Sequence, residues 1–319
     1  MIRRAMVAAV AAAGLVAGFA DTAAAQSYPD RIVELVVPAT PGSSADLLGR
    51  VLADGLSAAL GQKFVVINKP GGAGILGMGE VARAKADGYT LIHGAVYSIT
   101  VQPLTERNAG YTPKSFDPIC QTFKNDQVIV ARPGTYKNVA DMLAASKVKP
   151  GGLNYGTPGL GTIPHLAMAE LSQITKVPFN HVPFRGPPES IQMTAAGQID
   201  LAVAPLTAAA SSNLAMPGLF AQKRNPSIPD VPTVKEQGFD VAPLSIGGLF
   251  APAGLPADVK KKLDDACTAA MRSDTFRRIA KNTYQPDDFS ADSAGFKAHI
   301  EQDVVEKRRL LTALGMVKN

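Results

Sequence analysis

The 319-residue chain contains no tryptophan, two cysteines and four histidines, and only 18% of its residues are charged. The histidines, His93, His165, His181 and His299, have no metal-like spacing with cysteines or carboxylates, which argues against a zinc site. No Gly-x-Ser-x-Gly motif is present, and no nucleophile, base and orienting group stand at a recognisable spacing, which argues against an exported enzyme. The net charge of +5 is dispersed, so nucleic acid is not an expected partner.

Long apolar runs are missing everywhere except at the start of the chain. Arg3 and Arg4 precede an apolar run from Ala5 to Ala20, and small residues follow at Ala23–Ala25. This pattern predicts a secretory signal peptide over residues 1–25, cleaved near Ala25. No later stretch reaches the roughly 18 apolar residues of a membrane span, so we expect an exported, soluble protein.

The two cysteines, Cys120 and Cys267, leave two interpretations open. A lone pair in an oxidising compartment can form a disulfide. Cys267 lies on an apolar helical stripe with Val259, Leu263 and Met271, which favours two separately buried thiols.

The stretch GGAGILG places Gly72, Gly74 and Gly77 in the spacing of a dinucleotide-binding loop. Its context does not fit that function. Lys69 and Pro70 separate the glycines from the preceding strand, and the next strand ends in His93-Gly94 instead of an acidic residue for the ribose. We therefore expect no cofactor, and a turn whose glycines let a helix pack closely on a sheet.

Short apolar strands alternate with helices along the chain, which is typical of an α/β fold with mostly parallel sheets. The expected strands cover residues 31–38, 63–68, 89–94, 127–133, 179–184, 199–205 and 244–252, with a short one before the glycine loop near residue 156. The expected helices cover residues 45–61, 78–86, 138–146, 164–175, 188–196 and 257–271, with a long final helix within 289–315.

This order predicts two lobes joined by two crossings. Lobe 1 is expected at residues 26–124, lobe 2 at 125–245, and a return to lobe 1 at 246–319. The last helices lack enough strands for a third sheet and should cover lobe 1. Hinges are expected within residues 121–127 and 240–247, with a ligand cleft between the lobes. The basic cluster Lys307-Arg308-Arg309 is expected on a solvated helix face.

Two loops at the carboxyl ends of strands are the candidate binding elements. The first loop is PATPGSSAD, residues 38–46, and the second is YGTPGLGTIPH, residues 155–165. Both lead into a helix N-terminus, where backbone N–H groups are unpaired and the helix dipole is positive. Together they predict an anion site that needs no cation.

The mature chain resembles the Bug-type substrate-binding proteins of tripartite tricarboxylate transporters. The resemblance is carried by YPDRIVELVVPATPGSSADLLGR, LGQKFVVINKPGGAGILG, ADGYTL, LNYGTPGLGTIPHLA, HVPFRG, GQIDL and PDVPTVKEQG, in the family's order. It implies a type II-like, two-lobe periplasmic binding protein (a Venus flytrap) that is not an enzyme. Such a receptor binds a small organic acid in the interlobe cleft and delivers it to membrane permease subunits.

The resemblance also implies the site. Backbone amides and bridging waters of both loops should bind a ligand carboxylate, while the HVPFRG turn and the end of LAVAP line the wall of lobe 2. The implied ligand-binding residues are Thr40, Pro41, Gly42, Ser43, Ser44, Asp46, Thr157, Gly159, Leu160, Gly161, Thr162, His165, Phe184, Arg185, Gly186, Ala204 and Pro205.

Several alternatives stay open. Asp46 either contacts the ligand or braces its own loop, His165 either contacts the ligand or packs beneath the loop, and Arg185 either lines the site or is solvated. Ser43 and Ser44 replace the family's usual glycine pair, and Phe184 replaces a tyrosine. The ligand is a mono- or dicarboxylate, an aromatic acid or an amino acid, and the receptor is expected to be a monomer. A ligand-reporting partner of a sensor kinase would use the same pocket.

Overall fold

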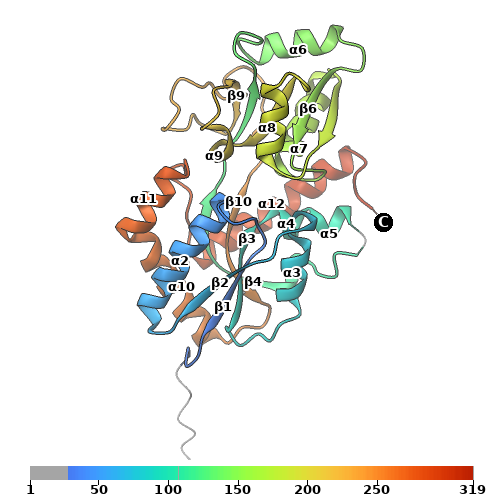
Figure 1. Cartoon of the computed structure of the whole chain (residues 1–319). Coiled ribbons are helices and arrows are strands. Elements are labelled where there is room, and N and C mark those ends of the chain that lie inside the picture. Colours follow the sequence, from blue (N-terminus) through green and yellow to red (C-terminus); the bar gives the residue numbers. More distant parts are fainter. Residues whose placement is uncertain (1–27, 107, 319) are drawn as a thin grey trace, which may run out of the picture.

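The structure, a computed structural model, describes residues 28–106 and 108–318; the predicted signal peptide lies outside these residues. They form two α/β lobes, drawn one above the other in Figure 1, with the first lobe below. The first lobe has a five-stranded sheet in the order β2-β1-β3-β10-β4. Its strands are β1 (Val33–Val37), β2 (Phe64–Asn68), β3 (Thr90–Ala95), β4 (Phe116–Lys124) and β10 (Ile246–Pro252).

The second lobe repeats this plan with a sheet in the order β7-β6-β8-β5-β9. Its strands are β5 (Gln127–Ala131), β6 (Leu153–Thr157), β7 (Phe179–Pro183), β8 (Leu201–Pro205) and β9 (Ala215–Phe220). Its helices are α6 (Val139–Val148), α7 (Ile163–Thr175), α8 (Pro187–Ala195) and α9 (Leu206–Ala209).

The helices of the first lobe come from both ends of the chain. They are α2 (Ser44–Leu60), η1 (Gly72–Gly74), α3 (Ile75–Ala82), α4 (Tyr97–Thr100), α5 (Gln102–Thr105), η2 (Pro113–Ser115), α10 (Ala257–Arg272), α11 (Asp274–Asn282) and α12 (Ser293–Ala313). Helix α2 buries Leu48, Leu52 and Leu56 completely and ends at Gly61 in a left-handed conformation, as its apolar spacing predicts. None of the helices within the described ranges combines the length and apolar character that a membrane span requires.

Both sheets are mixed, but four of the five strands in each run in the same direction, in agreement with the expectation of mostly parallel sheets. Strands β1, β2 and β3 are parallel, but β10 is antiparallel to β3 and β4. In the second sheet β5 is antiparallel to β8 and β9. The reason is that β5 and β10 each enter their lobe from the other lobe. They start at the interlobe edge, where the neighbouring strands end.

The chain crosses between the lobes twice, from β4 to β5 and along residues 221–245 from β9 to β10. The N–H of Asn125 donates to the carbonyl of Ser245 at 2.7 Å, so the two crossings lie side by side. The predicted hinges, residues 121–127 and 240–247, contain Asn125 and Ser245 respectively, and rotation about them remains a prediction.

Helices α10, α11 and α12 pack on the first lobe, where α10 and α11 contact α2 and α12 contacts β4. The basic cluster on α12 differs from its prediction, because Lys307 is buried. Its ammonium lies 3.1 Å from the Asp303 carboxylate and 3.3 Å from the carbonyl of Leu244, on the second crossing. Only Arg308 and Arg309 are solvated. Helical i,i+4 spacing aligns Asp303 with Lys307 on the face that packs inward.

Cys120 on β4 and Cys267 on α10 form a disulfide, which corrects the preference for two separate thiols. Both residues are fully buried in the core between the sheet and α10. The apolar stripe was identified correctly, but it packs α10 directly over β4 and thereby brings the two sulfurs together. The bond closes a loop of 147 residues that includes the whole second lobe.

Removal of this bond should destabilise the protein by about 2–5 kcal/mol, because the unfolded chain regains the entropy of a long open loop. The Cys120→Ala/Cys267→Ala double variant should unfold at a lower temperature than wild type in scanning calorimetry. Reductant should lower the wild-type midpoint and leave that of the double variant unchanged. Equal shifts in both proteins would contradict the assignment.

Candidate functional site

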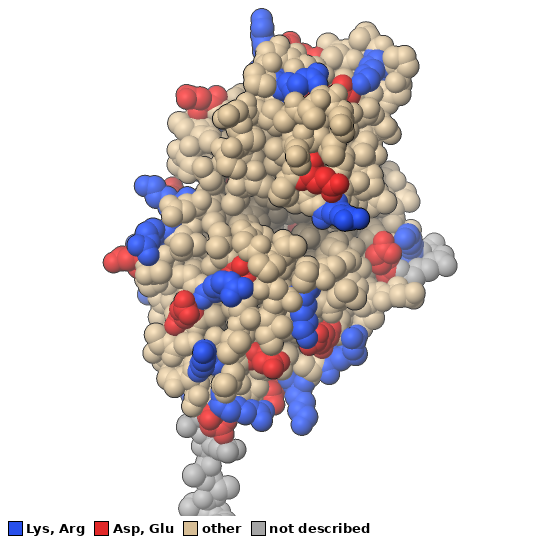
Figure 2. Space-filling view, viewed as in Figure 1, with Lys and Arg blue, Asp and Glu red and all other residues tan. Residues whose placement is uncertain are grey.

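The candidate site lies between the two lobes. The parallel strands β1 and β3 end at the interlobe edge of the first sheet, and β6, β7 and β8 end at the corresponding edge of the second. Figure 2 shows the surface hollowed between the lobes at this level. The first and second loops therefore approach the same cleft from opposite sides, as expected for strand-end binding sites in α/β proteins.

Asp46 organises the first loop. Gly42 adopts a left-handed conformation (φ 82°), and its N–H donates to the Asp46 carboxylate at 2.8 Å. The same carboxylate accepts from the Asn68 amide at 2.8 Å and pairs with Arg50 at 3.0 Å. Ser43 is the N-cap of α2. Asp46 is only 2% exposed, so this geometry favours the bracing interpretation over a ligand contact.

The hydrogen-bond partners of Asp46 keep its carboxyl group ionised. Burial by itself would raise the pKa of this carboxyl, but hydrogen bonds from Arg50, the Gly42 amide and Asn68 outweigh burial and lower it below its ordinary value. Asp46 therefore stays ionised at neutral pH, with its charge offset by Arg50.

The second loop repeats this arrangement with a different side chain. Gly161 is also left-handed (φ 72°), and its N–H donates to Nδ1 of His165 at 3.3 Å. In both loops the glycine immediately precedes the N-cap residue, and the acceptor is the third residue of the helix. His165 is buried beneath the loop, which matches the packing interpretation of this residue.

His181, on β7, belongs to the same assembly and was not among the predicted site residues. Its Nε2 lies 2.7 Å from the Thr157 hydroxyl, which also accepts from the N–H of Gly159 at 3.2 Å. The rings of His165 and His181 are 4.3 Å apart. His181 opens the HVPFRG motif, but only the pairing of β6 with β7 places it beneath the second loop.

Both histidines are neutral in the folded protein at neutral pH. Burial, and then the neighbouring His181, lowers the pKa of His165 to about 4, and burial lowers the pKa of His181 to about 4. With Nδ1 of His165 accepting from Gly161, its hydrogen must reside on Nε2.

Several backbone N–H groups of the two loops and helix starts have no hydrogen-bond partner among the described residues. They belong to Ser44 and Ala45 at the start of α2, to Leu160 in the second loop, and to Ile163 and His165 at the start of α7. The amides of Gly42 and Gly161 are used within their loops. Thr40, Pro41 and the Leu160 side chain are exposed, and Thr162 is the N-cap of α7. The unpaired groups can bind an anion without any cation.

The HVPFRG turn lies beside the second loop, because the N–H of Phe184 donates to the Thr157 carbonyl at 2.9 Å. Arg185 is exposed, and its N–H donates to the Glu189 carboxylate at 3.0 Å. Gly186 is the N-cap of α8. This geometry places the Arg185 side chain in solvent.

At the end of β8, Ala204 is completely buried in the sheet, and half-buried Pro205 is the N-cap of α9. Tyr97, which follows β3 at the interlobe edge, is a further candidate that the motif analysis did not identify. It is half-buried against a cluster that contains Val101 of the first lobe and Leu166 of the second. No periodicity or motif marks Tyr97, so only the folded chain reveals its place.

The glycines of GGAGILG have packing roles. Gly74 is left-handed, and a Cβ there would lie 2.6 Å from the Ser98 hydroxyl. A Cβ on Gly77 would lie 2.9 Å from Pro38 of the first loop. Ser98 donates to the carbonyl of Ala73 at 3.0 Å. The motif therefore lets α3 pack against the base of the first loop.

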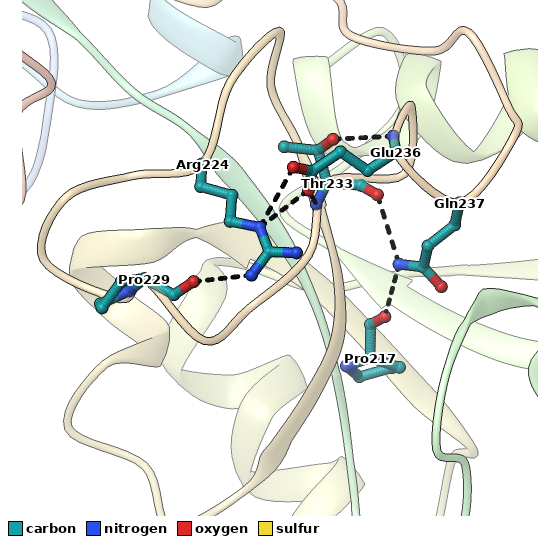
Figure 3. Close-up of polar contacts among 6 residues, drawn as sticks. All are labelled: Pro217, Arg224, Pro229, Thr233, Glu236 and Gln237. Carbon is teal, nitrogen blue, oxygen red and sulfur yellow. Dashed lines mark hydrogen bonds and ion pairs between the residues drawn. The ribbon is translucent and has the colours of Figure 1, made fainter.

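The PDVPTVKEQG motif is also structural (Figure 3). Thr233 and Glu236 exchange hydrogen bonds between side chain and backbone, and both Glu236 oxygens accept from Nε of Arg224. Gln237 donates to the Pro217 carbonyl at 3.0 Å, which fastens the segment to β9. The motif shapes the second crossing away from the two binding loops.

Comparison with known proteins gives one consistent result. The family model for the tripartite tricarboxylate transporter family receptor matches residues 48–316. A UPF0065 protein from the gbd 5' region of Cupriavidus necator is 33% identical over 335 residues, covering 99% of this chain and 98% of the relative.

Solved structures of similar proteins agree with the match to the family model. The periplasmic binding protein BugD superposes with a TM-score of 0.80 and 27% identity, over 92% of this chain and 100% of that one. R. palustris Rpa4515, solved with adipate, superposes with a TM-score of 0.82 and 27% identity, over 91% and 99%. The family and BugD are solute receptors, so these similarities indicate binding without catalysis.

Asp46→Asn should loosen the first loop and cost about 1–3 kcal/mol of folding free energy at neutral pH, because the Gly42 amide and Arg50 lose a charged acceptor. Because folding lowers the pKa of Asp46, its contribution is present above the ordinary carboxyl pKa and disappears as pH falls through the lowered value. The difference between variant and wild type should therefore shrink in strong acid. Denaturant unfolding of both proteins at a series of pH values measures this difference in stability.

The matched control is Asp54→Asn, an exposed carboxylate on the same helix. If Asp46→Asn were no less stable than Asp54→Asn at neutral pH, Asp46 would not brace the loop.

Proposed function

Because the chain belongs to the tripartite tricarboxylate transporter receptor family, we propose that it binds a small organic acid in the interlobe cleft and delivers it to the membrane permease of such a transporter. On this proposal the protein works in the periplasm after the signal peptide is removed. BugD is described as a periplasmic binding protein, and Rpa4515 was solved with adipate, which supports an acid as the ligand.

The observation that carries this proposal is the set of unpaired backbone N–H groups at the two helix starts. The amides of Ser44 and Ala45 come from one lobe, and those of Leu160 and Ile163 come from the other. A carboxylate placed between them would join the lobes, so binding would favour closure. The hydroxyl of Ser43 accepts from the Asp46 amide and still has its hydrogen to donate.

Hydrogen bonds from these backbone N–H groups are strong enough to bind a carboxylate. Four charge-assisted hydrogen bonds at about 1.5–3 kcal/mol each give roughly 6–12 kcal/mol before ordering costs. Micromolar affinity requires about 8 kcal/mol. Direct pairing with an arginine is therefore unnecessary, in agreement with the exposed position of Arg185.

A thermal-shift panel tests the proposal. The refolded mature protein should be stabilised by one or a few acids among adipate, shorter mono- and dicarboxylates, aromatic acids and acidic amino acids, and not by the matching amides. Ligand at a hundred times its dissociation constant adds about 2.7 kcal/mol, which is several degrees for a protein of this size. Stabilisation by amides as strongly as by acids, or by NAD alone, would overturn the carboxylate site.

Ser44→Pro tests the backbone contact itself. Ser44 is the first residue of α2, where proline is tolerated, and Ser43 has the extended conformation (φ −68°, ψ 161°) that a following proline requires. The variant removes one N–H and should weaken binding of the stabilising acid by the value of one charge-assisted bond, about 1.5–3 kcal/mol or roughly ten- to a hundredfold.

Ser44→Ala, which removes only the hydroxyl, is the control. Calorimetric titration of wild type, Ser44→Pro and Ser44→Ala with the same acid separates the contribution of the backbone N–H from that of the hydroxyl. Equal affinity of Ser44→Pro and Ser44→Ala would show that the Ser44 amide does not contact the ligand.

A further inference from the structure

The two helix starts are built alike but respond differently to protons. In the first loop the Gly42 amide is held by the carboxylate of Asp46, which Arg50 keeps ionised. In the second loop the Gly161 amide is held by an imidazole nitrogen, Nδ1 of His165. A carboxylate can accept this bond at any pH above about 4, whereas an imidazole can accept it only while that nitrogen carries no proton.

The surroundings of the imidazole give it no compensating charge. His165 is 6% exposed, and its ring lies 4.3 Å from that of His181. Tyr155 on β6 also faces the pair: its ring lies 5.1 Å from that of His181, and burial raises its pKa. Within the described ranges, neither ring makes a hydrogen bond or ion pair with Asp, Glu, Lys or Arg from α7, β6 or β7.

We propose that His165 and His181 are the positioning residues of the second loop, and that proton uptake by this pair releases the loop from its binding conformation. If the proposed function is correct, the affinity for the acid falls as the surroundings acidify.

The geometry explains the release. A proton on Nδ1 of His165 would point at the N–H of Gly161, so two donors would face each other and the bond would be lost. A proton on His181 would place a second charge within about 4 Å of the first, in a site from which water is largely excluded. The first loop keeps its brace in the same range, because the pKa of Asp46 is lowered.

The linkage between pH and loop release has a definite sign. The pKa of each histidine is about 4 in the folded loop and returns toward its ordinary value of about 6.5 when the loop is released. Above pH 6.5 neither state binds the proton. Between about pH 6.5 and 4 the released state gains about tenfold in population per pH unit for each proton taken up.

Amide hydrogen exchange on the ligand-free mature protein tests the proposal without knowledge of the ligand. Peptides that cover residues 157–165 should lose protection by about tenfold or more per pH unit below pH 6.5, after correction for intrinsic exchange rates. Peptides from β1 to β3 serve as the internal reference. They report general loosening of the first lobe, where burial also lowers the pKa of His93 to about 4.

His165→Asn and His181→Gln supply side-chain acceptors that do not titrate. His165→Asn should protect the loop at pH 7 and abolish the pH dependence, and His181→Gln should reduce its slope. His165→Leu, which has no acceptor, should leave the loop unprotected at every pH. His299→Gln, a histidine of α12 in the first lobe, is the matched control and should behave like wild type.

Nitrogen chemical shifts of the wild-type histidines give a second readout, because the proposal requires the Nε2–H tautomer of His165 at pH 7. A pH-independent loop in wild type, an equal pH dependence in His165→Asn, or the opposite tautomer would overturn the proposal. If the loop opens at low pH but the protein binds none of the tested organic acids, the proposed function is overturned, and the positioning role of His165 and His181 still holds.

Discussion

The unpaired backbone N–H groups at the start of a helix are the constraint on which this site depends. Each helix leaves such groups without partners, and a loop that precedes the helix must either use them or present them. Here each loop uses the N–H of a left-handed glycine, donated to a side chain four residues later, and leaves amides in the first turn of the helix unpaired. The side chains that hold these glycine amides are buried beneath the loops, and the unpaired backbone N–H groups are left without a partner within the described residues.

Because of the way the chain connects the lobes, both helix starts face the same cleft. Because β5 and β10 enter their sheets from the interlobe edge, all the parallel strands end at that edge, and the loops that follow them face one cleft. The C-terminal helices stabilise the same geometry from outside. The disulfide fastens α10 to β4, and Lys307 of α12 reaches the carbonyl of Leu244 on the second crossing.

Sequence reasoning missed one edge strand in each sheet, β4 and β9, and the reason is physical. Pro118 lies within β4, and Pro217-Gly218 lies within β9. These residues argue against a strand in a local analysis, but at the edge of a sheet a missing N–H costs little. Lys307 is a similar case. A basic cluster on an amphipathic helix does not indicate that its first residue is buried and contacts both Asp303 and the second crossing between the lobes.

By itself the sequence determined the alternation of strands and helices, the two loops that precede helices, the glycine turn that lets a helix pack closely on the sheet, and the family. These features are local, since they follow from apolar spacing, capping residues and glycine positions within a few residues of one another. Only the tertiary structure showed that Asp46 and His165 accept hydrogen bonds from their loops, that His181 lies beside His165, and that Cys120 is bonded to Cys267. These contacts join residues whose proximity depends on strand order and helix packing, which no local pattern encodes.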